Sequence, residues 1–186
     1  MGIFESLKDK IKDRISDPAF QDLVKEQSLK DLLTKREFHI SQAYLQREIL
    51  SKAVDDEILE LNLALSDGYG EISGKMKKRL IPFAIPFTAT FTIQGMEFSG
   101  ARKIVFLKLD QVGPIDLDWL TRKVVERIPF LSCMGGEMIS CDLTRVPRLA
   151  ELFAYRVKGI SIWDFITLKE LGLKQGEIVG RVGVVI

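Results

Sequence analysis

Few side chains in this sequence have the types and spacing that catalysis requires. His39 is the single histidine, and the two cysteines, Cys133 and Cys141, stand eight residues apart. One histidine excludes a multi-histidine metal site, and these three residues match no recognised ligand spacing. No pairing of a nucleophile with a base is visible either. We therefore expect a protein that is not an enzyme and that holds neither a metal nor another cofactor.

A glycine-rich segment looks superficially like a phosphate-binding loop. It contains Gly68, Gly70 and Gly74, followed by Lys75 and Met76. The glycines fit neither GxxxxGK[ST] nor GxGxxG, and a methionine stands where a hydroxyl should follow the lysine. The segment also joins two expected strands, so no helix N-terminus would face the phosphate. The pattern predicts a hairpin turn.

The densest cluster of charge is basic. It consists of Lys75, Lys77, Lys78 and Arg79, with Glu71 as the local acid. Each basic residue contributes roughly 1 kcal/mol beside an anionic lipid surface. Nucleic acid phosphates would attract the same charges, but no aromatic residues interleave with them to stack on bases. The cluster is typical of a headgroup or membrane contact or of a solvated strand end, and we expect no nucleic-acid partner.

Composition points to an ordinary globular chain. The 186 residues are 46% hydrophobic and 28% charged, with a formal net charge of +1, so no global field favours nucleic acid. One domain is the favoured count at this length. There is no 18-residue apolar run and no apolar signal-peptide core near the N-terminus. With two cysteines, this predicts a reducing cytoplasmic location, which includes the inner face of the membrane.

The first 56 residues predict helices. Apolar side chains recur at helical spacing from Ile3 to Ile15, with charges of both signs between them. Such helices contact either a membrane surface or a partner chain, and a second copy of this chain is one such partner. We expect residues 1–36 to form a helical arm and residues 37–186 to form a single α+β domain.

A longer helix is expected from Ser41 to Val54, where Leu45, Ile49 and Ala53 share one face. After it the period changes from helical to two. A strict alternation runs from Phe83 to Gln94, with phenylalanine and isoleucine on one face and threonine on the other.

Four strands in succession predict an antiparallel meander. They cover Leu59–Leu65, Tyr69–Arg79, Phe83–Gln94 and Ala101–Asp110. Pro86 within the third strand indicates an edge or a bulge, because proline cannot donate to the ladder. Beyond the meander we expect a helix over residues 117–128, a strand over 138–143, a short helix over 147–155, and strands over 157–168 and 177–186.

One pattern occurs twice and predicts two similar hairpins. Leu63-Ala-Leu65-Ser-Asp67-Gly68, then Glu71-Ile72-Ser-Gly74, is echoed by Leu171-Gly-Leu173-Lys-Gln175-Gly176, then Glu177-Ile178-Val-Gly180. Each copy reads as a strand, a glycine turn and a returning strand. Ile40-Ser41, Leu45 and Ile49 also match the helix start I-S/T-x-x-x-L-x-x-x-L.

With these motifs and this order of elements, residues 38–186 resemble small bacterial proteins of the tubular lipid-binding (TULIP-like) superfamily. The resemblance implies a strongly curved antiparallel sheet wrapped around a long helix, with an apolar groove for an acyl chain. The residues that would line the groove are Leu45, Ile49, Met76, Phe83, Phe87, Phe91 and Phe106. Each buried methylene of such a ligand contributes ~0.8 kcal/mol.

Two functions therefore remain open at the level of sequence. The first is non-enzymatic binding of a lipid or another apolar ligand in that groove, at the cytoplasmic membrane surface. The second is a protein-interaction or assembly module, in which the same phenylalanines form a closed core and the N-terminal helices contact a partner.

Overall fold

The computed structural model describes residues 35–79, 81–99, 102–113, 117–146, 150, 153–154, 156–157, 160–161 and 166–184. Of these described residues, 61% lie in strands and 19% in helices. The expected arm of residues 1–36 lies outside the described part, except for Lys35 and Arg36. The expected helix over residues 147–155 also falls mostly outside it.

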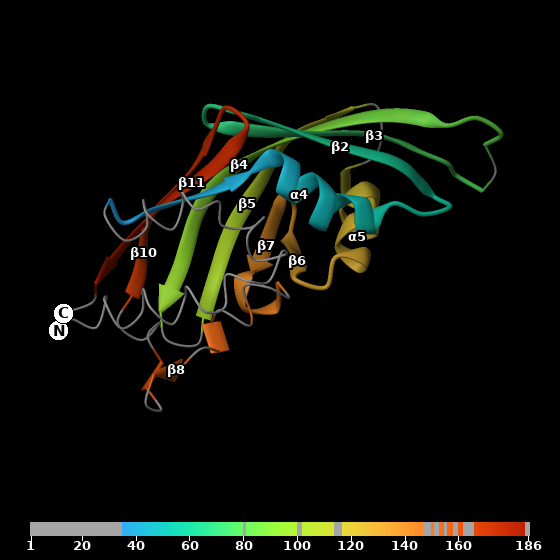
Figure 1. Cartoon of the computed structure of the whole chain (residues 1–186). Coiled ribbons are helices and arrows are strands. Elements are labelled where there is room, and N and C mark those ends of the chain that lie inside the picture. Colours follow the sequence, from blue (N-terminus) through green and yellow to red (C-terminus); the bar gives the residue numbers. More distant parts are fainter. Residues whose placement is uncertain are drawn as a thin grey trace.

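The larger sheet has six antiparallel strands in the order β2-β3-β4-β5-β7-β6 (Figure 1). They are β2 (Ile58–Ser66), β3 (Tyr69–Met76), β4 (Ile85–Ser99), β5 (Arg102–Gly113), β6 (Leu131–Gly135) and β7 (Met138–Asp142). The expected meander is confirmed as β2 to β5. β6 was missed, because Leu131 also continues the apolar face of the preceding helix.

The smaller sheet has three antiparallel strands in the order β1-β11-β10. They are β1 (Glu37–Ser41), β10 (Ile166–Lys174) and β11 (Glu177–Val184); a separate pair is formed by β8 (Arg156–Val157) and β9 (Ile160–Ser161). The prediction of helix throughout residues 1–56 was wrong at β1. There Phe38 packs over Gly180, while on the other face Glu37 pairs with Arg181 and His39 lies 3.1 Å from Glu177.

The helices are short. They are α4 (Gln42–Glu48), the 3-10 turns η1 (Leu50–Ala53) and η2 (Leu143–Arg145), and α5 (Leu117–Arg127). The helix expected from Ser41 to Val54 begins where predicted, with the Ser41 hydroxyl accepting from the Tyr44 amide at 3.3 Å. It ends at Ile49, where the Ser51 hydroxyl donates back to the Arg47 carbonyl and η1 takes over.

The prediction of a sheet wrapped around one long helix is therefore wrong. Two short helices, α4 and α5, cover the curved sheet (Figure 1). One apolar cluster contains Leu45 of α4, Ile49 after it, and Leu50 and Ala53 of η1. Val125 of α5 and the following Ile128 belong to the same cluster. A single long helix is not needed, because each short one buries part of the same inner face.

Glycines make room for the phenylalanines on the inner face of the larger sheet. Phe87 is opposite Gly74 and Phe91 is opposite Gly70 in the β3–β4 ladder. Each ring lies over its glycine so closely that a Cβ there would come within 3 Å of it. Such cross-strand pairing of an aromatic ring with a glycine stabilises a twisted sheet. Both rings are thereby packed against protein.

The outer edge of the larger sheet at β2 is closed by two glutamines of α4. The Gln46 side chain donates to the Leu61 carbonyl at 2.6 Å and accepts from the Leu63 amide at 2.8 Å. The Gln42 side chain accepts from the Leu65 amide at 2.7 Å. These three groups of the β2 edge are therefore already paired and are not available to a strand of another chain.

The two expected hairpins are confirmed, and their turns bind each other. Gly68 donates to the Leu173 carbonyl at 3.0 Å, and Gly176 donates to the Leu65 carbonyl at 3.0 Å. These four residues correspond pairwise in the repeated pattern, so the contact is reciprocal. Gly68 and Gly176 both have positive φ, +86° and +74°, which a glycine adopts without strain.

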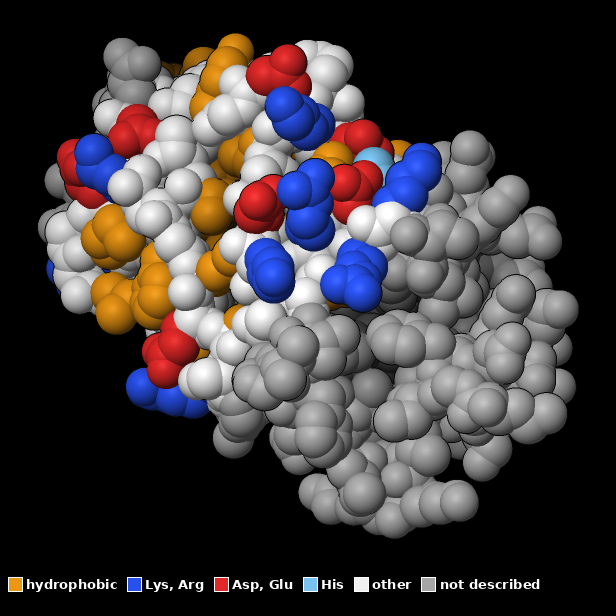
Figure 2. All heavy atoms as spheres, turned by 90° about the vertical axis from the view of Figure 1, so that its left-hand side faces the viewer, with side chains coloured by type: hydrophobic (Ala, Val, Ile, Leu, Met, Phe, Trp, Pro, Cys, Tyr) orange, Lys and Arg blue, Asp and Glu red, His pale blue; other side chains and the backbone are white. Residues whose placement is uncertain are grey.

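The outer face of the smaller sheet is charged. Figure 2 looks onto this face, where basic and acidic side chains surround the single histidine. Arg181 bridges Glu37 at 3.0 Å and Glu170 at 3.3 Å, and His39 Nδ1 lies 3.1 Å from Glu177 Oε2. The charges of opposite sign pair with each other along this solvated face.

Candidate functional site

The candidate site is the connection between β3 and β4, of which residues 77–79 and 81–84 are described. β2, β3 and β4 run beyond the helices, and this connection projects at their end (Figure 1). Met76 pairs with Ile85 as the last rung of the ladder, and the Lys77 amide donates to the Glu57 carbonyl at 2.7 Å. The Ile81 amide donates to the Lys78 carbonyl at 2.9 Å and so closes a turn.

Pro86 marks where β4 leaves the body of the sheet. It pairs with Lys75 on β3, whereas the β4–β5 ladder begins two residues later, at Thr88 and Gly113. β4 therefore has a neighbour on one side only at Pro86, which is where proline is tolerated in a sheet. Of the two predicted alternatives, an edge or a bulge, the structure shows a local edge at Pro86.

The four basic residues of the cluster are not equivalent. Lys77 and Arg79 are exposed, and Lys78 is half-buried. Lys75 is exposed too, but its ammonium lies 3.0 Å from Glu60 Oε2 on β2. The hydrogen bond from Lys75, and a second one from Asn62, hold the pKa of Glu60 below its ordinary value. The positive charge of Lys75 is therefore already offset by Glu60 when the protein meets an anionic surface.

Phe83 differs from the other phenylalanines of the sequence pattern. It precedes the first residue of β4 and is 67% exposed. It stands in the same connection as Lys77 and Arg79, so an aromatic ring and two cations share one protruding segment. The sequence pattern had assigned Phe83 to the apolar face of a strand, because the alternation already begins at Phe83, two residues before the first residue of β4.

The other residues expected to line a groove fall into two groups. Met76, Phe87 and Phe91 are buried, at 0%, 3% and 9% exposure, and Leu45 and Ile49 pack against them within one cluster. Phe106 is half-buried on β5, in register with Gly95 and Ser140. Its neighbour Leu107 packs against the core, so Phe106 points to the opposite face. An acyl-chain groove along these residues stays a prediction.

Leu59 lies at the same end of the sheet as this connection. A register shift between Ile58 and Glu60 leaves Leu59 as an extra residue of a β-bulge, and it is 43% exposed. Ile58, one residue earlier, takes the inner position and is fully buried. The adjacent apolar pair at the start of the strand was the sequence signal for this bulge, and the alternation of leucines concealed it.

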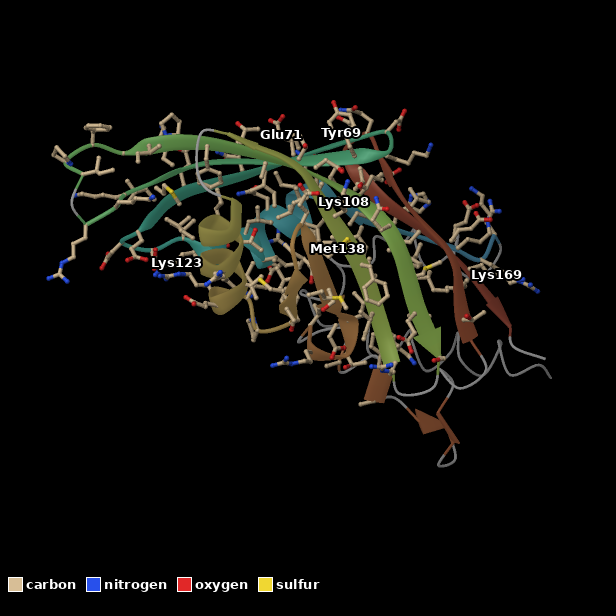
Figure 3. All side chains as sticks on the ribbon, turned by 180° about the vertical axis from the view of Figure 1, so that it is seen from behind. Tyr69, Glu71, Lys108, Lys123, Met138 and Lys169 are labelled. Carbon is tan, nitrogen blue, oxygen red and sulfur yellow. The ribbon has the colours of Figure 1, made fainter. Side chains whose placement is uncertain are left out.

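Acidic residues beside the bulge are held by α5. Lys123 Nζ lies 2.8 Å from Glu57 Oε2, and the Arg127 guanidinium pairs with Asp55. Glu57, through its hydrogen bond, raises the pKa of Lys123. Asp55 also accepts from the amides of Glu57 and Ile58 at 2.8 and 2.7 Å. Figure 3 shows Lys123 on α5, toward the end where the connection projects.

The residues whose side chains could take part in catalysis or bind a metal are scattered through the fold. His39 lies on the smaller sheet, Cys133 on β6 and Cys141 on β7. The two thiols are free, and the ladder sets Cys133 opposite Ile139 and Cys141 opposite Leu131. Within the described residues, no group of three histidine, cysteine or carboxylate side chains could hold a metal ion.

No protein-family model matches the chain, and neither a curated protein nor a solved structure resembles it significantly. The resemblance to tubular lipid-binding proteins therefore stays a prediction. Among the helices that the structure describes, none is long and apolar enough to cross a membrane.

Proposed function

We propose that this protein binds reversibly and without catalysis to an anionic lipid surface through the connection between β3 and β4. The observation that carries the proposal is Phe83, exposed in a protruding segment that also presents Lys77 and Arg79. A ring inserted among acyl chains and cations at the level of the phosphates is a common way to hold a protein on a bilayer.

The expected affinity is modest. Full burial of a phenylalanine side chain contributes about 1.5–3 kcal/mol. Two basic residues near an anionic surface contribute roughly 1 kcal/mol each. A total of about 4 kcal/mol corresponds to about a thousandfold accumulation at the surface. Such binding is reversible and weakens as salt screens the charges.

Co-sedimentation with vesicles tests the proposal. The protein should sediment with phosphatidylcholine vesicles that contain phosphatidylserine and much less with phosphatidylcholine alone. Phe83→Ala and the double change Lys77→Gln with Arg79→Gln should each reduce binding on the order of tenfold, on the magnitudes above. Tyr69→Ala is the matched control, because Tyr69 is exposed at the opposite end of β3 (Figure 3).

Thermal unfolding should be measured for every variant. Phe83 is exposed, so its replacement should leave the melting temperature unchanged while binding falls. Equal binding to both kinds of vesicle, or full binding by the Phe83 variant, would contradict the proposal.

A further inference from the structure

We infer that Leu59, displaced from the strand by its bulge, is a second apolar anchor for the same lipid surface, so that the sheet docks end-on. The inference rests on the proposed function and adds an orientation to it. We call the surface formed by Leu59, Lys77, Arg79 and Phe83 the tip surface.

The register of the sheet puts the two apolar residues at the same end, with Phe83 nearer the tip than Leu59. Ile58 pairs with Met76, and Met76 pairs with Ile85, so β2 begins where β3 ends and β4 begins. Leu59 follows Ile58, and Phe83 precedes Ile85 by two residues. Adjacent strands are about 4.8 Å apart, so the backbones of β2 and β4 lie about 10 Å apart across this end. Two anchors at that spacing fix a tilt, which one anchor does not.

Exposed apolar side chains gather at this end. Among the described residues, the large exposed hydrophobic side chains are Val54, Leu59, Tyr69, Phe83 and Met134. Val54 precedes Asp55, whose amide donates to the Ile58 carbonyl at 2.7 Å, so it too lies beside the start of β2. Three of the five therefore lie at one end of one sheet. Such clustering marks an interaction surface, whereas single exposed residues do not.

The charges at this end favour an anionic partner. Lys77 and Arg79 are exposed, while Asp55 and Glu57 are paired with Arg127 and Lys123 of α5. The pairing offsets two negative charges that would otherwise repel anionic headgroups, and Asp56 is left as the exposed acid of that turn. An anionic lipid surface offers phosphates to the cations and acyl chains to Leu59 and Phe83, so it fits better than a purely acidic or a purely apolar partner.

Site-specific fluorescence tests the inference. In a Cys133→Ser background, Leu59→Cys, Phe83→Cys and Tyr69→Cys are each labelled with the environment-sensitive dye NBD. Phosphatidylserine-containing vesicles should shift the emission to the blue at positions 59 and 83 and leave position 69 unchanged. Leu59→Ser should lower the vesicle partition coefficient about tenfold, as expected when a leucine's burial is lost. The matched Tyr69→Ser should have no effect.

The outcomes separate the inference from the proposed function. A shift at position 83 alone, with Leu59→Ser binding normally, overturns the second anchor and leaves the proposed function standing. No sedimentation of the unmodified protein with any vesicle overturns both. A shift at position 69 shows that another face docks, which overturns the tip surface. Blue shifts that appear without vesicles as protein concentration rises identify a second copy as the occupant and also overturn it.

Discussion

At the scale of single residues, glycines make room for three of the phenylalanines in the two sheets. Phe87 and Phe91 each cover a glycine on β3, and Phe38 covers Gly180 in the same way on the smaller sheet. These glycines have ordinary negative φ, so their role is to leave space and not to permit a turn. The rings of Phe87 and Phe91 fill that space and belong to the core cluster.

Gly74 should therefore be intolerant of any side chain. A Cβ at Gly74 would lie 2.1 Å from the Glu60 carbonyl oxygen and 2.9 Å from the Phe87 ring. We expect Gly74→Ala to lower the free energy of unfolding by about 3 kcal/mol, the upper range for overpacking. Urea unfolding measures it. Gly95→Ala on β4 is the control, because nothing lies within 4 Å of its Cβ position, and it should change stability by less than about 1 kcal/mol. Equal effects of the two would contradict this account of the pairs.

The two cysteines should differ sharply in reactivity. Burial, with a smaller contribution from the charge of Asp142, raises the pKa of the Cys141 thiol to about 12. Cys133 is exposed on β6. Because the thiolate is the reactive form, one thiol per chain should react with a maleimide at pH 8, and both should react in denaturant. Mass spectrometry of peptides identifies the site. Modification of Cys141 at the rate of Cys133 in the folded protein would contradict the burial.

The sequence predicted the inner face of β4 correctly and its first residue incorrectly. Phe87, Ala89 and Phe91 alternate with threonines and are all buried. Phe83 continues the same alternation but precedes the strand, and no local pattern distinguishes it. The prediction for Leu59 was wrong for a related reason. A bulge shifts the alternation by one residue, whereas a period of two assumes that no shift occurs.

At the scale of elements, side chains of α4 replace the neighbour that β2 lacks. Gln42 and Gln46 stand four residues apart, on one side of the helix, and bind three outward backbone groups of the strand. Sequence reasoning treated α4 as an apolar cover for the sheet and overlooked these glutamines. Their spacing was visible, but a glutamine pair at that spacing is equally typical of a solvated helix face.

Gln46→Met should show how much this contact contributes to the free energy of unfolding. Methionine keeps the length of the side chain but leaves the Leu63 amide and the Leu61 carbonyl without their partner. Loss of a partner from a part-buried backbone group costs about 1–3 kcal/mol, so the free energy of unfolding should fall by about 2 kcal/mol. Gln94→Met, at an exposed side chain bonded to Thr92, should change it by less than about 0.5 kcal/mol. If Gln46→Met left the free energy of unfolding unchanged, water would replace the Gln46 side-chain amide as the partner of these backbone groups.

At the scale of the whole molecule, two sheets are joined by the reciprocal contact of their hairpin turns. The sequence pattern predicted both hairpins, yet the copies are out of register after the turn. Ser66 pairs with Tyr69 and Lys174 with Glu177, so Glu71 and Glu177 are not equivalent positions. How the hairpins meet was not predictable, because turn residues carry no signal for a partner far away in the chain.

The reciprocal contact makes the two sheets one cooperative unit, which hydrogen exchange can test. Amides in exposed turns usually exchange quickly, but the amides of Gly68 and Gly176 each donate to the opposite hairpin. We expect both to exchange as slowly as the strand amides of β2, because their opening requires the sheets to separate. Gly136, an exposed residue of the turn between β6 and β7, serves as the fast control. Rapid exchange at Gly68 and Gly176, with β2 still protected, would show that the smaller sheet opens independently.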